Sequence, residues 1–212
     1  MKQLFTKEAM LRFVAVVAVA LTIAVGITRV AADDRFSLSY STGSKPTGSL
    51  TFVNLGETRF YGMTSAGGAN GAGVIFSFDL TDSYTVVHDF DLTEGAIPYG
   101  DLVADPVTGI LYGMTSGGGA NGAGVLFSFD TQTNTYTKLY DFVETTGKIP
   151  FGSLTYLDGK LYGMTNSGGD NDGGVIFSFD ITGGTYTALY SFTPPDGISP
   201  LGSLTAVGGT LY

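Results

Sequence analysis

The residues best suited to bind a ligand are asparagines that recur in glycine-rich stretches of the chain. Asn70, Asn121 and Asn171 occupy the same place in three such stretches. An Asn side chain both donates and accepts hydrogen bonds, as recognition of a glycan or peptide requires. The alternative is structural, because Asn and Gly also supply the positive φ angles of tight loops. Three further polar residues complete the candidate ligand-binding set: Ser65, Ser116 and Asn166.

The third glycine-rich stretch differs from the others in carrying two acids, in the order Asp170-Asn171-Asp172-Gly173. Ca²⁺ takes carboxylate and carbonyl oxygens, so Asp170 and Asp172 are the candidate metal ligands. The other two stretches have Ala and Gly at the matching positions, and the full EF-hand pattern with its closing Glu is absent. We therefore expect no cofactor, and the alternative is a calcium ion at this stretch.

Three aspartates, Asp79, Asp130 and Asp180, recur at the ends of matching segments and resemble a catalytic set. An Asp at a strand end more often accepts hydrogen bonds from the turn that follows. Equivalent positions in successive repeats also lie too far apart for the carboxylate spacing that glycoside hydrolysis needs. We therefore expect a structural role for them and assign no catalytic residue.

His88 is the only histidine, and the chain contains no cysteine. The repeat described below aligns His88 with Tyr140 and Tyr190, which predicts a packing role for its ring. Without Cys or a second His, the usual pairs of nucleophile and base cannot be assembled. Disulfides and cysteine metal sites are excluded for the same reason.

These candidate residues belong to an internal sequence repeat. Tyr61-Gly62-Met63-Thr64 returns beginning at Tyr112 and at Tyr162, and a short Gly-Ser/Asp-Leu segment opens units near residues 48, 100, 152 and 202. A fixed period of about fifty residues is typical of a propeller or a solenoid.

Each unit alternates short apolar runs with turn residues, which predicts four strands and no helix. In the third unit we place them at 153–157, 160–165, 174–180 and 186–192, with the hairpin signal Asp158-Gly159 between the first two. The expected fold is all-β: tandem, β-propeller-like, four-stranded antiparallel blades, incomplete in this chain.

Two connections repeat between units: the loop after the second strand, and a link with Gly three residues before Pro. Both lie at the same end of a four-stranded meander, so we expect ligand binding there. Residues 36–40 match a fourth strand, which in a closed propeller would complete the last blade. The chain stops at Tyr212, within a second strand, which we interpret as truncation.

The N-terminus has the pattern of a signal peptide. Basic residues precede an apolar run over 13–27, and small residues at 30–32 favour cleavage after Ala32, which leaves 33–212 as the repeat region. The alternative is an uncleaved anchor. With cleavage we expect an exported protein, extracellular, at the cell surface or periplasmic, with no membrane insertion.

Residues 33–212 contain 6 Lys and Arg against 18 Asp and Glu. Such an acidic chain repels phosphate backbones and anionic lipid, so nucleic acid is excluded as a partner. A glycan or a protein ligand is left as the expected partner.

The unit Leu-Tyr-Gly-Met-Thr, Gly-Gly, Asn-Gly, Gly-Val-Ile/Leu-Phe, Thr-x-Leu-Tyr-x-Phe and Gly-x-x-Pro resembles the GloVer-type tandem repeat of exported bacterial proteins. A looser similarity is to kelch repeats, which share the period and the double glycine but carry a Trp that is missing here. The resemblance implies no activity. We expect a noncatalytic binding or scaffold module; the alternative is a polysaccharide hydrolase whose channel site is completed by missing blades.

Overall fold

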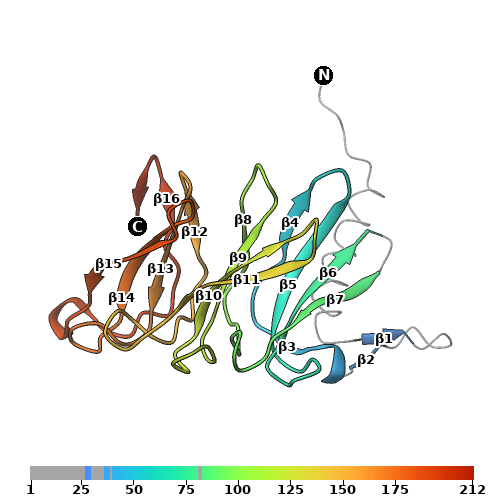
Figure 1. Cartoon of the computed structure of the whole chain (residues 1–212), viewed down its shortest axis with the longest axis horizontal. Coiled ribbons are helices and arrows are strands. Elements are labelled where there is room, and N and C mark those ends of the chain that lie inside the picture. The colour runs from blue at the N-terminus through green and yellow to red at the C-terminus, as the bar shows by residue number, and fades with distance from the viewer. Residues whose placement is uncertain (1–26, 30–35, 39, 81–82) are drawn as a thin grey trace.

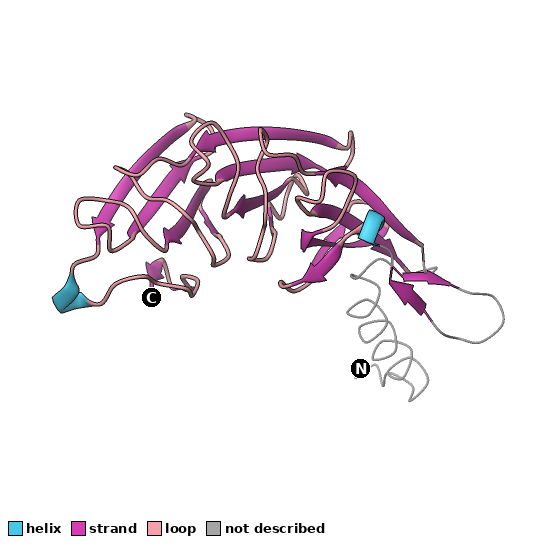
Figure 2. Ribbon diagram, turned by 90° about the horizontal axis from the view of Figure 1, so that it is seen from below, coloured by secondary structure: helices cyan, strands magenta, loops and turns pink. Residues whose placement is uncertain are grey.

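A computed structural model describes residues 27–29, 36–38, 40–80 and 83–212. The chain forms three antiparallel blades that stand side by side along an arch (Figures 1 and 2). Two short 3-10 helices, Tyr40–Thr42 and Pro194–Asp196, are the helical segments of the described residues. Within the same ranges no helix is long and apolar enough to cross a membrane.

Each blade is a meander in which every strand pairs with the next one along the chain, as the repeat predicts. Blade 1 contains β4 (Thr51–Asn54), β5 (Thr58–Ala66), β6 (Val74–Asp79) and β7 (Tyr84–Asp89). Blade 2 contains β8 (Val103–Ala104), β9 (Leu111–Thr115), β10 (Val125–Asp130) and β11 (Thr135–Asp141). Blade 3 contains β12 (Thr155–Leu157), β13 (Lys160–Thr165), β14 (Val175–Asp180) and β15 (Thr185–Ser191).

Local features shape the blades, some in one unit and some in all three. The turn between β12 and β13 has Asp158 at φ 50° and Gly159 at φ 75°, the two positive angles of a type I′ hairpin. In each blade the ladder between the third and fourth strands shifts register at the same point, for example between Ile75 and Phe76 in blade 1.

The glycine of the repeated Tyr-Gly-Met-Thr segment makes room for an aromatic ring from the neighbouring strand. Gly113 lies opposite Phe127 in the β9–β10 ladder, and a Cβ on Gly113 would come within 2.5 Å of the Phe127 ring. Gly62 and Gly163 have the same relation to Phe76 and Phe177. The repeat therefore keeps glycine at this position because of close packing.

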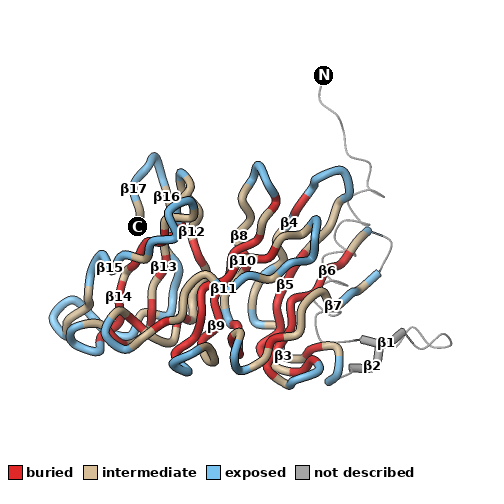
Figure 3. Tube along the Cα trace, in the orientation of Figure 1, coloured by how far each residue is buried: buried red, intermediate tan, exposed pale blue. Residues whose placement is uncertain are grey.

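Rings fill the joints between blades. Between blades 2 and 3, Tyr140 of β11 stacks on Tyr186 of β15 at 4.1 Å between ring centroids, and Phe142 meets Phe177 edge to face at 5.4 Å. Between blades 1 and 2, His88 takes the place of Tyr140 and stacks on Tyr136 at 4.2 Å. The predicted packing role of His88 is thus confirmed. Figure 3 shows buried residues concentrated in β5, β9 and β10, inside the row of blades.

The two ends of the described chain depart from the blade pattern. The N-terminal strand forms as β2 (Phe36–Leu38) and pairs with β1 (Ile27–Arg29). The described blades do not close into a propeller, so the expectation that this strand completes a last blade stays a prediction. A strand at the following link, β3 (Ser44–Pro46), pairs with the end of β5. β16 (Ala206–Val207) and β17 (Thr210–Leu211) form a hairpin that begins a fourth unit. Apart from residues 27–29, the predicted signal peptide lies outside the described residues.

Candidate functional site

The repeated loops and the links meet at one end of the blades, as the meander predicts. The Ile97 N–H donates to the Ala72 carbonyl in the loop of blade 1, at 2.9 Å, and the Ile97 carbonyl accepts from the Ser116 N–H next to the loop of blade 2, at 3.1 Å. We call this end the loop face; it comprises loops 67–73, 118–124 and 168–174 with links 91–98 and 143–150. The next joint repeats the pattern with Ile149, Ala123 and Asn166.

The central residue of each link adopts an unusual backbone conformation. Ile97 and Ile149 have φ angles of 59° and 56°, in the left-handed region that β-branched residues avoid. Hydrogen bonds from both neighbouring blades hold the backbone N–H and carbonyl of these residues, which explains how the strain is tolerated. The links are thus rigid joints between blades.

Asn70 and Asn121 anchor their loops. Their amide groups donate to the carbonyls of Phe90 and Phe142, at 3.1 and 3.0 Å, yet both residues remain exposed. Neither Asn has a positive φ; the residue that follows does, at 73° in Gly71 and 67° in the matching Gly122. Their structural role is therefore side-chain anchoring, which leaves the exposed part of each amide to face solvent.

The predicted hydroxyls lie deeper than the asparagines. Ser65 and Ser116 are buried, and their hydroxyls donate to the carbonyls of Lys45 and Ile97, at 3.1 and 2.8 Å. Asn166 is half-buried beside the link of blade 2. A ligand on the loop face would meet the asparagines before these three residues, whose binding role stays a prediction.

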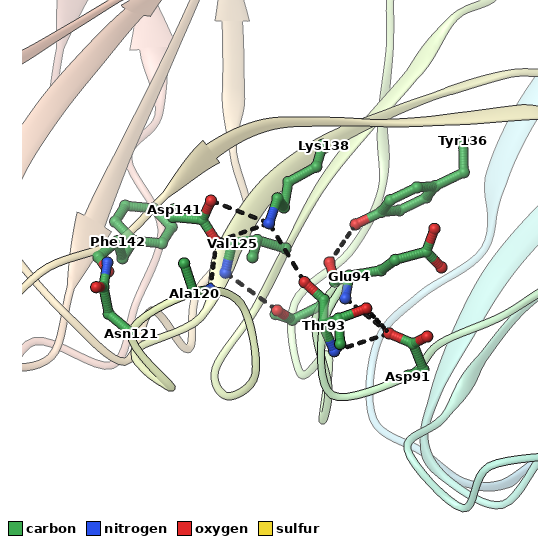
Figure 4. A network of polar contacts seen from close by, with 11 residues as sticks. Asp91, Thr93, Glu94, Ala120, Asn121, Val125, Tyr136, Lys138, Asp141 and Phe142 are labelled. Carbon is green, nitrogen blue, oxygen red and sulfur yellow. Dashed lines mark hydrogen bonds and ion pairs between the residues drawn. The ribbon is translucent and has the colours of Figure 1, made fainter.

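The loop of blade 2 is further fixed by charged neighbours (Figure 4). Asp141 accepts a hydrogen bond from the Ala120 N–H at 2.7 Å and pairs with Lys138 at 3.0 Å. Lys138 also reaches the Thr93 carbonyl in the preceding link, at 3.3 Å. Loop, outer strand and link are thereby connected.

In blade 3 the loop is held differently, because Ser191 replaces the aspartate. Asp172 accepts a hydrogen bond from the Gly168 N–H at 2.7 Å, and Lys148 lies 3.3 Å from the same carboxylate oxygen. Lys148 also pairs with Glu144 at 2.7 Å. The hydrogen bond from Gly168 and the contact with Lys148 lower the pKa of Asp172.

These contacts bear on the calcium prediction for Asp170 and Asp172. Both residues are exposed, and one oxygen of Asp172 is already engaged by a lysine and a backbone amide. The described part of the chain contains no group of three or more His, Asp or Glu side chains placed to hold a metal ion. The two acids do fit a weak cation site in type, and calcium binding stays a prediction.

A cavity of about 330 Å³ opens on the loop face, between the loop of blade 2 and the link that follows the outer strand of that blade. It brings Asn121, a predicted residue, together with Glu144 and Lys148, which sequence reasoning did not select. Their position in the link that ends in Gly147-x-x-Pro150 was the available signal, because links and loops were expected to meet. The remaining lining residues are Gly122, Ala123, Val143 and Ile149.

The recurrent strand-end aspartates serve turns, as expected. Asp79, Asp130 and Asp180 accept hydrogen bonds from backbone N–H groups of the turns that follow, at 3.1, 2.8 and 2.8 Å. The hydrogen bond from Gln132 lowers the pKa of Asp130. These carboxylates lie at the end of the blades opposite the loop face.

Two solved structures are similar to part of this chain, both at low sequence identity. A puromycin-hydrolysing peptidase of Mycobacterium tuberculosis matches 61% of this chain and 18% of its own, with 14% identity and a TM-score of 0.42. A variant of the isopeptidase AtxE2 with Astexin3-dC4 bound matches 76% and 24%, with 11% identity and a TM-score of 0.45. The chain thus spans less than a quarter of the length of either protein.

No curated protein matches the sequence. The model of one family, the Gloeobacter/Verrucomicrobia repeat, matches residues 17–212. That range includes every described blade, loop and link, and it agrees with the repeat found in the sequence. The chain therefore belongs to the Gloeobacter/Verrucomicrobia repeat family.

Proposed function

We propose that this chain is an exported, noncatalytic binding or scaffold module that takes a glycan or protein ligand on its loop face. The observation that carries the proposal is the cavity between the loop and the link of blade 2, which is lined by the amide of Asn121, the ammonium of Lys148 and the carboxylate of Glu144. A few converging polar groups in a concave site are typical of ligand recognition.

The rigidity of the loop face supports this function. Its loops are closed by backbone hydrogen bonds such as that from Gly124 to Gly118, at 3.0 Å, and its links are fixed on both sides. A preorganised surface loses little conformational entropy when a ligand binds. Modest polar contacts can therefore give useful affinity.

A noncatalytic role is favoured because the recurring carboxylates have structural partners. A glycoside hydrolase needs a carboxyl group with a raised pKa as general acid. Hydrogen bonds instead lower the pKa of described acids such as Asp91, Asp130 and Asp172, whose carboxylates accept them. The polysaccharide hydrolase alternative would thus require groups other than these.

Export is proposed from the N-terminal sequence alone. Expression in a Gram-negative host, followed by N-terminal sequencing of the exported protein, should give Asp33 as the first residue. A product that retains Met1 and stays with the membrane would instead support the uncleaved anchor.

Binding is tested by screening a glycan array and a peptide array with the exported protein. Lys148→Ala should weaken any hit tenfold or more, because it removes the cation of the cavity. The link of blade 1 carries Ala96 at this position, so the repeat tolerates the change. Lys160→Ala, at an exposed lysine of β13, is the matched control.

The repeated asparagines are tested together. Replacing Asn70, Asn121 and Asn171 with Ala should abolish the binding of a ligand that spans several loops. The thermal midpoint should stay within a few degrees of that of the unchanged protein. Undiminished binding by both this triple variant and Lys148→Ala would refute a loop-face site. A parallel screen with EDTA and with added Ca²⁺ tests the cation predicted at Asp170 and Asp172.

A further inference from the structure

The outer side of blade 3 exposes apolar side chains, and those on its fourth strand match residues that pack against the next blade in blade 2. Leu189, Tyr190, Ile198 and Leu201 are 51%, 43%, 57% and 67% exposed. Leu139 and Tyr140, which match the first two in blade 2, are partly buried against blade 3. We call Leu189, Tyr190, Phe192, Ile198 and Leu201 the open face.

The open face holds half of a ring cluster. At the joint between blades 2 and 3, Tyr140 and Phe142 from one blade contact Phe177 and Tyr186 from the next. Phe90 and Phe142 are completely buried by such contacts, whereas Phe192 is only half-buried. Tyr190 and Phe192 keep the same edge-to-face geometry, with centroids 5.4 Å apart. Their surface is therefore already shaped as the first half of a joint.

A row of glycines also indicates that a further unit fits next to blade 3. A Cβ on Gly100 would lie 2.3 Å from the carbonyl oxygen of Gly152, and a Cβ on Gly152 would lie 1.9 Å from that of Gly202. Around Gly202 a Cβ would meet nothing within 4 Å. Gly100 and Gly152 must be glycine because the next unit lies so close. Residue 202 is also glycine, although no part of the described chain lies near it.

The inner edge of the next unit is already in place. The Asp101 N–H donates to the Ser153 hydroxyl at 2.8 Å, and the Ser153 N–H donates to the Ser203 hydroxyl at 2.7 Å. The β16–β17 hairpin follows Ser203 and occupies the position of the first two strands of a blade. What is uncovered is the region where the third and fourth strands would lie.

We infer that the open face docks a further blade of the same repeat, whose fourth strand carries a tyrosine at the position of Tyr136 and Tyr186. Its ring would stack on Tyr190. Its hydroxyl would donate to the carbonyl of Asp196, because Tyr136 and Tyr186 donate to the equivalent carbonyls of Glu94 and Thr146, both at 2.6 Å.

A second copy of this chain is a poor occupant, since the matching side of blade 1 is already taken. Tyr84, the tyrosine of blade 1, donates to the Thr42 carbonyl at 2.6 Å, and the Tyr40 carbonyl accepts from the Gly68 N–H at 2.9 Å. Residues 40–46 thus occupy the place on blade 1 that the link of another copy would need. The fitting partner is a blade without such a cover.

The experiment extends the full chain after Tyr212 with a copy of residues 163–200, which continues the second strand in register and completes a fourth blade. The thermal midpoint should rise by roughly 5 °C or more, because the added blade buries apolar surface. Hydrogen exchange at residues 189–191 should slow at least tenfold. The matched control carries Tyr186→Ser in the appended copy only, and should lose most of both effects.

A second variant separates docking from independent folding of the extension. Tyr190→Ser should leave the midpoint of the unextended chain within about 1 °C, while it should remove most of the gain in the extended chain. An unchanged midpoint with unprotected residues 189–191 in the extended chain would overturn the inference. So would an unextended chain that dimerises with residues 189–191 protected, because the occupant would then be a second copy.

Discussion

The joint between blades 1 and 2 and the joint between blades 2 and 3 have nearly the same geometry but differ in one ring. His88 stacks on Tyr136 at 4.2 Å, and Tyr140 stacks on Tyr186 at 4.1 Å. The hydroxyl of Tyr140 has a hydrogen-bond partner in Thr146 at 2.8 Å.

The imidazole of His88 has fewer hydrogen bonds than the phenol of Tyr140. Buried Nε2 of His88 has no hydrogen bond and lies 3.5 Å from the carboxylate of Glu94. The comparison teaches that ring shape sets the spacing of the blades, whereas the polar tip of the ring decides how one joint responds to pH. Mutations at matching positions in the two joints can test this division.

The largest effect is expected where a completely buried ring is lost. Phe142→Ala should lower the free energy of unfolding by about 3–5 kcal/mol, and Phe90→Ala should do the same, because each leaves a cavity among packed rings. Urea unfolding followed by circular dichroism measures both. A difference of more than about 2 kcal/mol between the two would break the equivalence of the joints.

A smaller effect is expected at the tyrosines that bond to the links. Tyr136→Phe and Tyr186→Phe keep the stacked ring but remove a hydroxyl that donates to a link carbonyl at 2.6 Å. Each should cost about 1 kcal/mol. The test is thermal unfolding of both variants; Tyr99→Phe, at an exposed tyrosine, is the control and should be neutral.

The joints should differ in their response to pH. Burial lowers the pKa of His88, although Glu94, Asp89 and Asp91 oppose the shift. The unfolded chain then binds a proton more readily than the folded one, so stability is full above about pH 6.5 and falls as pH drops toward the folded pKa.

His88→Tyr places the ring of the other joint beside Glu94, which stands where Thr146 lies in that joint. It should remove this part of the pH dependence, with a gain of about 0.5 kcal/mol near pH 7. Unfolding midpoints between pH 5 and 8 measure it. Because the aspartates and glutamates are common to both proteins, the difference curve isolates His88. A flat difference curve would contradict the prediction.

The smallest effect is expected on the open face. Leu189→Ser should change stability by less than about 0.5 kcal/mol, because Leu189 is 51% exposed. The matching change in blade 2, Leu139→Ser, should cost clearly more, since Leu139 packs against the cluster at the joint with blade 3. Equal costs would mean that the open face is buried in solution.

Much of this architecture is predictable from the sequence. The fifty-residue period, the four strands of each unit and the Asp158-Gly159 hairpin depend on local patterns, and local patterns are sufficient to define strands and turns. The shared end of loops and links follows from the alternation of strand direction in a meander. The role of His88 was predictable because the repeat aligned it with two tyrosines.

Other features depended on contacts that no local pattern encodes. Asn121, Glu144 and Lys148 come together because a loop of one blade meets a link from its own outer strand, and the resulting cavity has no sequence signature. Ser65 and Ser116 are buried with their hydroxyls donating to backbone carbonyls about twenty residues earlier in the chain. The pairing of β2 with β1 was missed because a strand pattern indicates extended backbone without identifying the partner strand.

The sequence by itself determined that this protein is a tandem array of four-stranded blades, because each unit repeats the same glycine-rich loop, the same link and the same alternation of apolar residues. Only the tertiary structure decided which rings are buried and which are not. Tyr140 and Tyr190 stand in nearly identical local sequences, yet one is stacked on the next blade and the other is 43% exposed. Burial depends on what lies across the joint, which a single unit does not encode.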